Sequence, residues 1–302
     1  MSNQVSSVPR SVRASTGPVV TNRGWRLVIR YVILLFGVIF ALYPFMMILW
    51  ASFDSSNSIS GQGLLPKEIV LKNYETLFSR PETPVLRWLA NSIFVSTTST
   101  LITLSLTTLA AYSFSRYRFR GRQAGLLGTL IIQVFPGVVA LVAFYLLLQQ
   151  IGEFIPWLGL NSLGGLILIY CGGALGSGAW LMKGYFDTIP RDLDESAQVD
   201  GATHWMTFRT IILPLVRPIL AVTAIFSFFG TFNDYLVPRV LLRDKDVYTL
   251  AVGMTSFLEN QFNRVWGVFA AGALLGAIPM LIAFILLQSQ IVGGLSSGAV
   301  KG

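Results

Sequence analysis

Charged residues are absent from six long stretches of this chain, and this spacing constrains the fold more than any other feature. A helix that rises about 1.5 Å per residue needs about 20 apolar residues to cross a hydrocarbon core about 30 Å thick. The charge-free stretches are residues 31–53, 88–115, 123–152, 154–182, 218–233 and 265–300. We therefore predict an all-α integral membrane protein with six transmembrane helices, one for each stretch.

The composition supports this prediction. Hydrophobic residues make up 53% of the chain and charged residues only 12%, with a mean hydropathy of +0.65. A soluble domain usually carries about twice this share of charge, so the composition excludes soluble enzymes and nucleic-acid-binding proteins. The fifth stretch is the shortest, and its helix could begin near Ile211 if the Arg217 side chain extends toward the membrane surface.

Arginines indicate how the chain is oriented, because basic residues are retained on the cytoplasmic side of a membrane. Residues 1–30 contain five arginines and no acidic residue, and the short segment 116–122 contains four more. Two predicted spans separate these segments and place them on the same side, and the total of six spans places the C-terminus there as well. We therefore expect both termini in the cytoplasm, with residues 1–28 as a flexible tail, 29–291 as the transmembrane domain and 292–302 as a C-terminal tail.

The segment 183–217 carries most of the signals for function. Pro190 suits the first turn of a helix, and the acidic residues after it suit the positive end of a helix, so a short helix is predicted over 190–199. Gly201 supplies a break, and a second helix is predicted to stop near Pro214. Most charged connecting segments are only solvated loops, but the apolar residues of the second helix favour a protruding knob.

The same segment resembles the EAA loop of ABC importer permeases, the loop that docks on the cytoplasmic ATPase in that family. The resemblance rests on Glu195, Ser196, Ala197, Asp200, Gly201, Ala202, Phe208, Ile211, Leu213 and Pro214. It implies that these residues belong to an ATPase-coupling loop at 186–214, with Glu195 as a charged anchor and Gly201 as the turn. Ser196 departs from the family pattern, which has alanine there.

The resemblance extends over nearly the whole chain after residue 27 and is to permeases of carbohydrate importers, most closely the smaller permease subunits of maltose and maltodextrin importers. It is carried by residues 91–122, 134–165, 241–254 and 293–302. It implies a type I ABC importer permease fold in a bacterial or archaeal cytoplasmic (inner) membrane. The implied partners are a second permease, two ATP-binding subunits and an extracytoplasmic sugar-binding protein.

The chain lacks the sequence signature of an ATPase. A phosphate-binding loop of the G-x-x-x-x-G-K-[ST] type needs lysine followed by serine or threonine, and no lysine of this chain has such a neighbour. We therefore expect a transport subunit that is not an enzyme and binds no cofactor or metal of its own, with ATP and Mg²⁺ held by the partner ATPase.

Two further sites follow from the resemblance. The segment 254–266 resembles a loop that enters the sugar-binding protein, and the expected tip is Asn260, Gln261, Phe262 and Asn263, although an ordinary external turn is the alternative. Asn233 and Asp234 resemble a pattern found in sugar importer permeases and are candidates for the translocation pathway. A charge at a helix end explains Asp234 at least as well.

The competing functions lack their expected residues. A proton- or sodium-coupled secondary transporter would ordinarily show ionisable residues near the middle of a span or inverted repeats of hydropathy. A membrane enzyme would need clustered histidines, cysteines or carboxylates, whereas the chain has one histidine and one cysteine. For the substrate, the resemblance implies maltose or maltodextrin, with trehalose or another α-glucoside as the alternative.

Overall fold

The computed structural model describes residues 23–54, 69–134, 136–173, 176–258 and 265–299. All regular elements in these ranges are helical, as predicted. Four of the described helices are long and apolar enough to cross a membrane, and a bent pair makes a fifth span if its two helices are counted together. The chain divides into two units, residues 1–47 and 48–302.

The first unit contains most of helix α1, Arg23–Phe53. The helix begins before residue 28, so the expected N-terminal tail is shorter than predicted, and residues 1–22 lie outside the described residues. Its side chains from Val28 to Tyr43 are mostly apolar and exposed. A helix that is apolar all round is typical of a membrane span.

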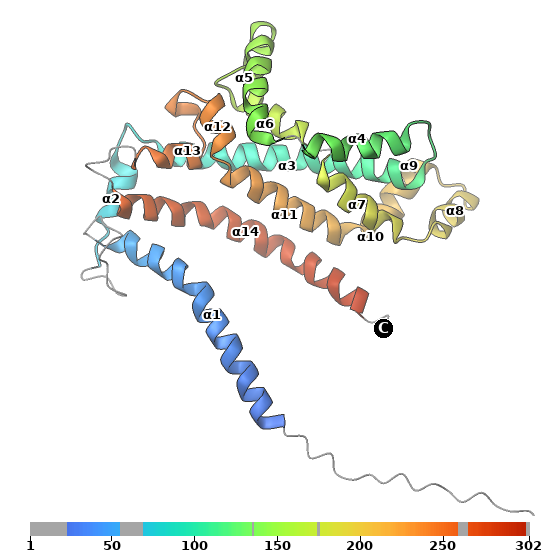
Figure 1. Cartoon of the computed structure of the whole chain (residues 1–302), viewed down its shortest axis with the longest axis horizontal. Helices are drawn as coiled ribbons and strands as arrows, with labels where there is room; N and C mark the ends of the chain where they lie inside the picture. The colour runs from blue at the N-terminus through green and yellow to red at the C-terminus, as the bar shows by residue number, and fades with distance from the viewer. Residues whose placement is uncertain (1–22, 55–68, 135, 174–175, 259–264, 300–302) are drawn as a thin grey trace, which may run out of the picture. The chain divides into compact units, whose positions relative to one another are not determined.

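The second unit is built around α3, Val85–Arg116, which packs against α6, α7 and α11. Helix α11, Arg217–Asn233, packs in turn against α14, Trp266–Ala299 (Figure 1). Short helices surround these three long ones, and the N-terminal end of α14 packs on α2, Lys72–Ser79. Helix α14 continues through Ala299, so most of the expected C-terminal tail is helical.

The third and fourth predicted spans are each broken, so the prediction of one continuous helix for each stretch is wrong. The third forms α4, Arg122–Val134, and α5, Gly137–Phe154. Pro136 between them has extended backbone angles and no N–H to donate, which ends a helix. The fourth forms the 3₁₀ turn η1, Pro156–Leu158, then α6, Leu163–Gly172, and α7, Ser177–Asp187. Glycines at the end of α6 permit the second break.

The predicted knob is present with shifted boundaries. Helix α8 spans Asp192–Val199, and the next helical run comprises α9, His204–Thr207, the π-helical turn η2, Phe208–Ile212, and α10, Leu213–Leu215. The run ends at Leu215, one residue after Pro214, close to where the sequence predicted its end. The Leu213 N–H donates to the Phe208 carbonyl, a wider turn that accommodates the proline. The run then bends by 75° into α11.

The opposite end of the second unit carries α12, Leu236–Leu241, the 3₁₀ turn η3, Lys245–Val247, and α13, Leu250–Thr255. The segment from η3 to the start of α13 is fixed to α3 by neutral hydrogen bonds and by an exposed ion pair, in which Arg87 Nη1 lies 2.8 Å from Asp246 Oδ1. Trp88 Nε1 donates to the Lys245 carbonyl at 2.7 Å, and Asn91 donates to the carbonyls of Asp246 and Tyr248 at 3.0 and 2.9 Å. Trp88, fully buried, packs directly on Gly253.

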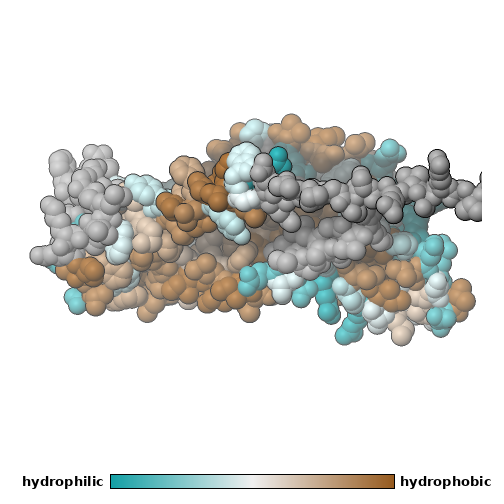
Figure 2. All heavy atoms as spheres, turned by 90° about the horizontal axis from the view of Figure 1, so that it is seen from below, coloured by the Kyte–Doolittle hydropathy of each residue, from teal (hydrophilic) through white to brown (hydrophobic). Residues whose placement is uncertain are grey.

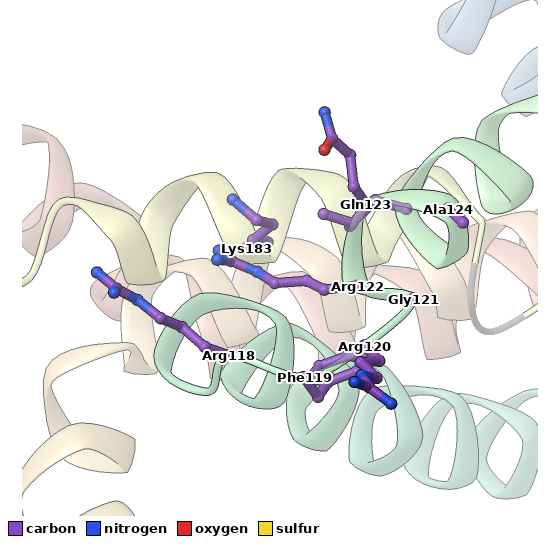
Figure 3. A pocket seen from close by; sticks show the side chains of 9 residues that line it. Arg118, Phe119, Arg120, Gly121, Arg122, Gln123, Ala124 and Lys183 are labelled. Carbon is purple, nitrogen blue, oxygen red and sulfur yellow. The ribbon is translucent and has the colours of Figure 1, made fainter.

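The surface of the molecule is rich in apolar side chains. Figure 2 shows apolar residues along most of one face, and hydrophilic residues gather toward the end that carries α8 and α10 in Figure 1. At that end, the turn between α3 and α4 and the side chain of Lys183 line a concavity of about 830 Å³ (Figure 3). An apolar surface with polar ends is typical of a membrane protein.

Candidate functional site

The knob formed by α8 and α9 owes its shape to a sharp turn at Gly201. The φ angle of Gly201 is 86°, in the left-handed region that residues with a Cβ rarely adopt. The Ala202 N–H donates to the Ala197 carbonyl at 2.9 Å, and the Gly201 N–H donates to the Gln198 carbonyl at 3.0 Å. These two bonds form a Schellman motif, so the predicted glycine break is confirmed and ends α8.

The start of each knob helix is also stabilised by its sequence. All three acidic residues of α8 lie in its first turn, where negative charge interacts favourably with the positive end of the helix. The Thr203 hydroxyl accepts a hydrogen bond from the Met206 N–H at 3.2 Å and caps α9. Local sequence therefore specifies both helices.

A buried ion pair fastens α8 to the end of α3. Arg116 Nε lies 2.9 Å from Asp194 Oδ2, and the two side chains are only 7% and 11% exposed. The same guanidinium donates to the carbonyls of Phe186 and Ile189 at 3.2 and 3.1 Å. Arg116 thus joins three segments: the end of α3, the end of α7 and the start of the knob.

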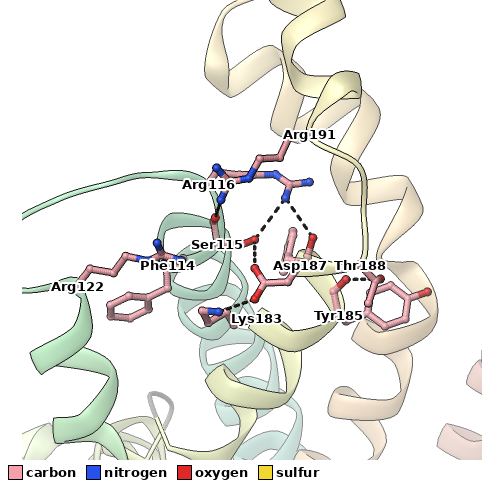
Figure 4. A network of polar contacts seen from close by, with 10 residues as sticks. Phe114, Ser115, Arg116, Arg122, Lys183, Tyr185, Asp187, Thr188 and Arg191 are labelled. Atoms are coloured by element: carbon pink, nitrogen blue, oxygen red, sulfur yellow. Dashed lines mark hydrogen bonds and ion pairs between the residues drawn. The ribbon is translucent and has the colours of Figure 1, made fainter.

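A second group of polar contacts lies beside this ion pair (Figure 4). Arg191 donates to the Ser115 carbonyl at 2.9 Å, and the Ser115 hydroxyl donates to Asp187 Oδ1 at 2.6 Å. Lys183 approaches the other oxygen of Asp187 at 2.5 Å. Burial raises the pKa of the Asp187 carboxyl, but the hydrogen bonds from Lys183 and Ser115 outweigh it and hold that pKa below its ordinary value.

Aromatic packing holds the second half of the knob. The Phe208 ring lies 4.7 Å from the Tyr112 ring and 5.4 Å from the Trp205 ring, between centroids. Phe208 and Ile212 are buried with Met182 and Phe186 in one cluster. A motion of the knob would therefore be carried into α3 and α7 through packed side chains rather than absorbed by a loop.

The opposite face of the knob is open. Glu195, Ser196, Asp200 and Gly201 are exposed. Apolar side chains lie on the same two helices and are exposed as well, among them Val199 (87%) and Met206 (55%). Such apolar side chains beside charged ones are characteristic of a protein-binding surface.

The predicted coupling residues therefore fall into two groups. The exposed group named above is free to contact a partner protein. Ala197 and Phe208 are buried, and the partly buried members are Ala202, Leu213 and Pro214. The buried members support the knob and are not available for docking.

The residues that fasten the knob were not identified from the sequence. Arg116 contributed to the prediction only as one cation of a basic turn, and Asp194 only as a charge near a helix N-terminus. No local pattern pairs residues so far apart in the chain. A charge at the end of a long apolar helix is the one available signal, because such a charge needs a partner if it is buried.

The predicted pathway residues lie at the end of α11. Asp234 Oδ2 accepts a hydrogen bond from the Tyr170 hydroxyl at 2.9 Å, and Oδ1 accepts one from the Leu236 N–H at 2.9 Å. Asp234 therefore joins α6 to the start of α12. Asn233 is exposed and lines a cavity of about 390 Å³ between α11, α13 and α14.

The predicted loop tip Asn260, Gln261, Phe262 and Asn263 lies outside the described residues. Within the part of the chain that the structure describes, no group of three or more histidine, cysteine, aspartate or glutamate side chains could hold a metal ion.

Comparisons with known proteins identify the family. Residues 103–290, which include the knob and its fastening residues on α7, match the family described as binding-protein-dependent transport system inner membrane component. The chain belongs to this permease family. The chain is also similar to the maltose/maltodextrin transport system permease protein MalG of two bacteria. It is 43% identical over 272 residues to MalG of Vibrio vulnificus strain YJ016, covering 86% of this chain and 91% of that one.

The second relative and the solved structures extend this result. The chain is 42% identical over 288 residues to MalG of Escherichia coli strain K12, covering 92% of this chain and 96% of that one. A chain of a bacterial ABC transporter that imports alginate superposes with a TM-score of 0.73 and 23% identity, covering 93% and 99%. Its complex with a periplasmic protein bound to alginate pentasaccharide gives a TM-score of 0.60 at 20% identity, covering 88% and 93%. These two structures confirm the permease fold.

Proposed function

We propose that this permease subunit belongs to an ATP-driven importer of maltose or maltodextrin. The two MalG proteins support this substrate, because the identity extends over nearly the full length of both chains. The chain would form the translocation path together with a second permease of the MalF type. Trehalose or another α-glucoside is the alternative, since the sugar contacts are expected mainly on the second permease.

One observation supports a role of the knob in coupling an ATPase to the membrane helices. The exposed face of α8 and α9 is fastened to α3 and α7 by a buried ion pair and by aromatic packing. An ATPase that moves this knob would therefore move two membrane helices with it. ATP-binding subunits of the MalK type fit this surface, with Glu195 as the charged contact and Val199 and Met206 as apolar contacts.

The remaining roles are those that the resemblance to sugar importer permeases implies. ATP and Mg²⁺ would be bound by the partner subunits, and this chain would act as a transport subunit without an ATPase site of its own. The α8 end would face the cytoplasm together with both termini, in a six-span topology in a bacterial inner membrane. The segment 260–263 would contact the extracytoplasmic sugar-binding protein, and Asn233 and Asp234 would lie near the pathway.

A secondary transporter is the more distant alternative. It would move sugar without ATP and without the other subunits. Reconstitution separates the two functions: the chain is incorporated into vesicles with its neighbouring permease, ATPase and binding protein, and ATP hydrolysis is measured with maltose, maltotriose and trehalose.

We expect maltodextrins to stimulate hydrolysis. Stimulation by another sugar alone would change the substrate and keep the architecture. Sugar transport by this chain alone, without ATP, would contradict the proposal.

Two substitutions test the coupling surface in the same assay. Glu195→Lys reverses the exposed charge, and Gly201→Asp places a side chain at a φ of 86°. Both variants should insert in the membrane but lose the link between ATP hydrolysis and transport. Arg120→Gln, a change in an exposed residue outside the knob, is the control and should remain coupled. Normal coupling in both knob variants would count against the docking assignment.

A further inference from the structure

Basic side chains gather where α3 turns into α4. The concavity of about 830 Å³ at this turn is lined by three arginines of the turn and by Lys183 of α7. In Figure 3 the charged ends of Arg118, Arg122 and Lys183 extend to the same side, whereas Arg120 points away. Two elements far apart in the sequence thus present three cations to one space.

Most of this positive charge is not neutralised by the protein. Lys183 is paired with Asp187, and Arg122 Nε donates to the Phe114 carbonyl at 2.7 Å, which satisfies one donor but leaves the charge. Among the described residues, neither Arg118 nor Arg122 has a carboxylate within ion-pair distance. Asp187 is the acidic group facing Arg122 from α7, and it is already bound to Lys183 and Ser115.

The start of α4 adds to the positive potential. The concavity is lined by Gly121, directly before this 13-residue helix, and by Arg122, Gln123 and Ala124 of its first turn. The first N–H groups of a helix have no acceptor within the helix and carry partial positive charge. The Arg122 N–H donates to the Phe119 carbonyl at 3.3 Å, so the N–H groups of Gln123 and Ala124 remain. An anion in this space would meet guanidinium groups and the positive end of a helix together, the combination that binds phosphate.

The surroundings indicate the kind of anion. The residues of α4 that follow the turn are apolar and exposed, among them Leu127 (51%) and Ile131 (70%). Phe119, within the turn, is 46% exposed. In a membrane protein such side chains face lipid tails, so the cations lie where a tail joins its headgroup.

We propose that this concavity, formed by Arg118, Arg122, Lys183 and the first turn of α4, binds the phosphate of an anionic phospholipid. The site rests on the proposed function only for its side of the membrane, the cytoplasmic leaflet. A bound lipid would fix the α3–α4 turn close to Ser115, whose carbonyl accepts a hydrogen bond from Arg191 at the base of the knob.

The test measures lipid retention directly. The full-length protein, purified with its co-expressed subunits in detergent, is delipidated and titrated with phosphatidylglycerol, phosphatidylcholine or inorganic phosphate, and bound lipid is counted by native mass spectrometry. This readout requires neither transport nor ATP hydrolysis, so its failure is distinguishable from failure of the proposed function.

Wild type should bind phosphatidylglycerol in preference to phosphatidylcholine. Arg118→Gln should weaken phosphatidylglycerol binding roughly tenfold, since a hydrogen bond to a charged group is lost. The double variant Arg118→Gln/Arg122→Gln should weaken it further. Arg118→Lys keeps the charge and should retain most of the binding.

Arg120→Gln is the matched control, because it removes the same charge from the same turn but from a side chain that points away. It should change binding by less than about threefold. Equal losses in Arg118→Gln and Arg120→Gln would overturn the site in favour of general surface charge. Binding of inorganic phosphate as tight as that of phosphatidylglycerol would overturn the lipid assignment. Unchanged lipid binding with loss of the ATP-binding subunit in Arg118→Gln would show that the surface docks protein instead.

Discussion

The two ends of the helical unit 48–302 are held together by different chemistry. At the α8 end, a buried ion pair between Arg116 and Asp194 and the hydrogen bond from Arg191 to the Ser115 carbonyl join the knob to α3. At the α13 end, neutral donors such as Trp88 and Asn91 bind backbone carbonyls. The α8 end therefore depends on a buried charged pair, whereas the ion pair of the α13 end, Arg87 with Asp246, is exposed and contributes little, so that end rests on several neutral bonds.

This difference predicts which substitutions destabilise each end. Removing one partner of a buried ion pair leaves an uncompensated charge, which costs more than the loss of a neutral hydrogen bond. The α8 end should thus be sensitive to single substitutions of charged residues. The α13 end should be destabilised chiefly by substitutions that change side-chain volume beside Trp88, because this ring is packed without free space.

The largest effect is expected for Asp194→Ala. It leaves Arg116 largely buried without its carboxylate, and the free energy of unfolding should fall by about 3 kcal/mol. The measurement is denaturant unfolding of the protein in detergent. In a double-mutant cycle, Arg116→Met combined with Asp194→Leu should cost less than the sum of the two single changes. Additive costs would show that the two side chains do not act as a pair.

A smaller effect is expected at the other end for Gly253→Ala. A Cβ at this position would lie 2.2 Å from atoms of the Trp88 ring, so the helices must shift, at a cost of about 1–3 kcal/mol. Gly230→Ala is the control, because nothing lies within 4 Å of a Cβ there, and it should be neutral or slightly stabilising. Thermal unfolding of both variants checks the prediction, and equal stability would refute the close packing.

Asn161 tests the hydrogen bonds that hold the segment between α12 and η3, one of which, from its Nδ2 to Asp244 Oδ2 at 2.6 Å, is charge-assisted. It has a positive φ of 58°, and its side-chain oxygen accepts from the N–H groups of Arg243 and Asp244 at 2.8 and 2.9 Å. Asn161→Ala should destabilise by about 1–2 kcal/mol, because the bonds are lost and alanine is strained at this φ. Asn161→Gly loses the bonds without the strain and should cost less. If denaturant unfolding showed that Asn161→Gly costs more stability than Asn161→Ala, backbone strain would be excluded as a contribution.

The smallest effect is a pH dependence at the α8 end. The pKa of Asp187 is lowered in the folded protein, so its ionised form contributes stability above its unfolded-state pKa, the ordinary aspartate value of about 3.9. That contribution should be lost as the pH falls through the lower folded-state pKa. The stability difference between wild type and Asp187→Asn should therefore be constant above about pH 5 and shrink below about pH 4. A difference that grew on acidification would reverse the assigned direction of the pKa shift.

The sequence predicted the parts of the fold that depend on local chemistry. Long apolar runs predicted α1, α3 and α14, and Gly201 predicted the turn of the knob because only glycine suits its φ angle. The breaks within 123–152 and 154–182 were missed, since hydropathy does not distinguish a straight span from two shorter helices. Pro136 lies at the first of these breaks, and its full effect depends on the packing of α4 and α5.

For the candidate site, the sequence predicted which segment protrudes but not how it is held. The resemblance named Glu195, Gly201 and Phe208 together, yet Phe208 is buried against Tyr112 and supports the knob from inside. The pairing of Arg116 with Asp194 depends on how α3 and α8 meet in space. Such a contact has no periodicity or spacing that a single sequence could reveal.

The most direct test of the account is whether the exposed face of the knob is covered by the ATP-binding subunit. Val199→Cys, at a position 87% exposed, is labelled with a maleimide reagent in a Cys171→Ser background, with and without that subunit. We predict rapid labelling of the chain alone and strong protection in the complex, while Arg120→Cys, at an exposed position of the α3–α4 turn that points away from the concavity, stays reactive in both. Equal labelling of Val199→Cys with and without the ATP-binding subunit would contradict the coupling role of the knob.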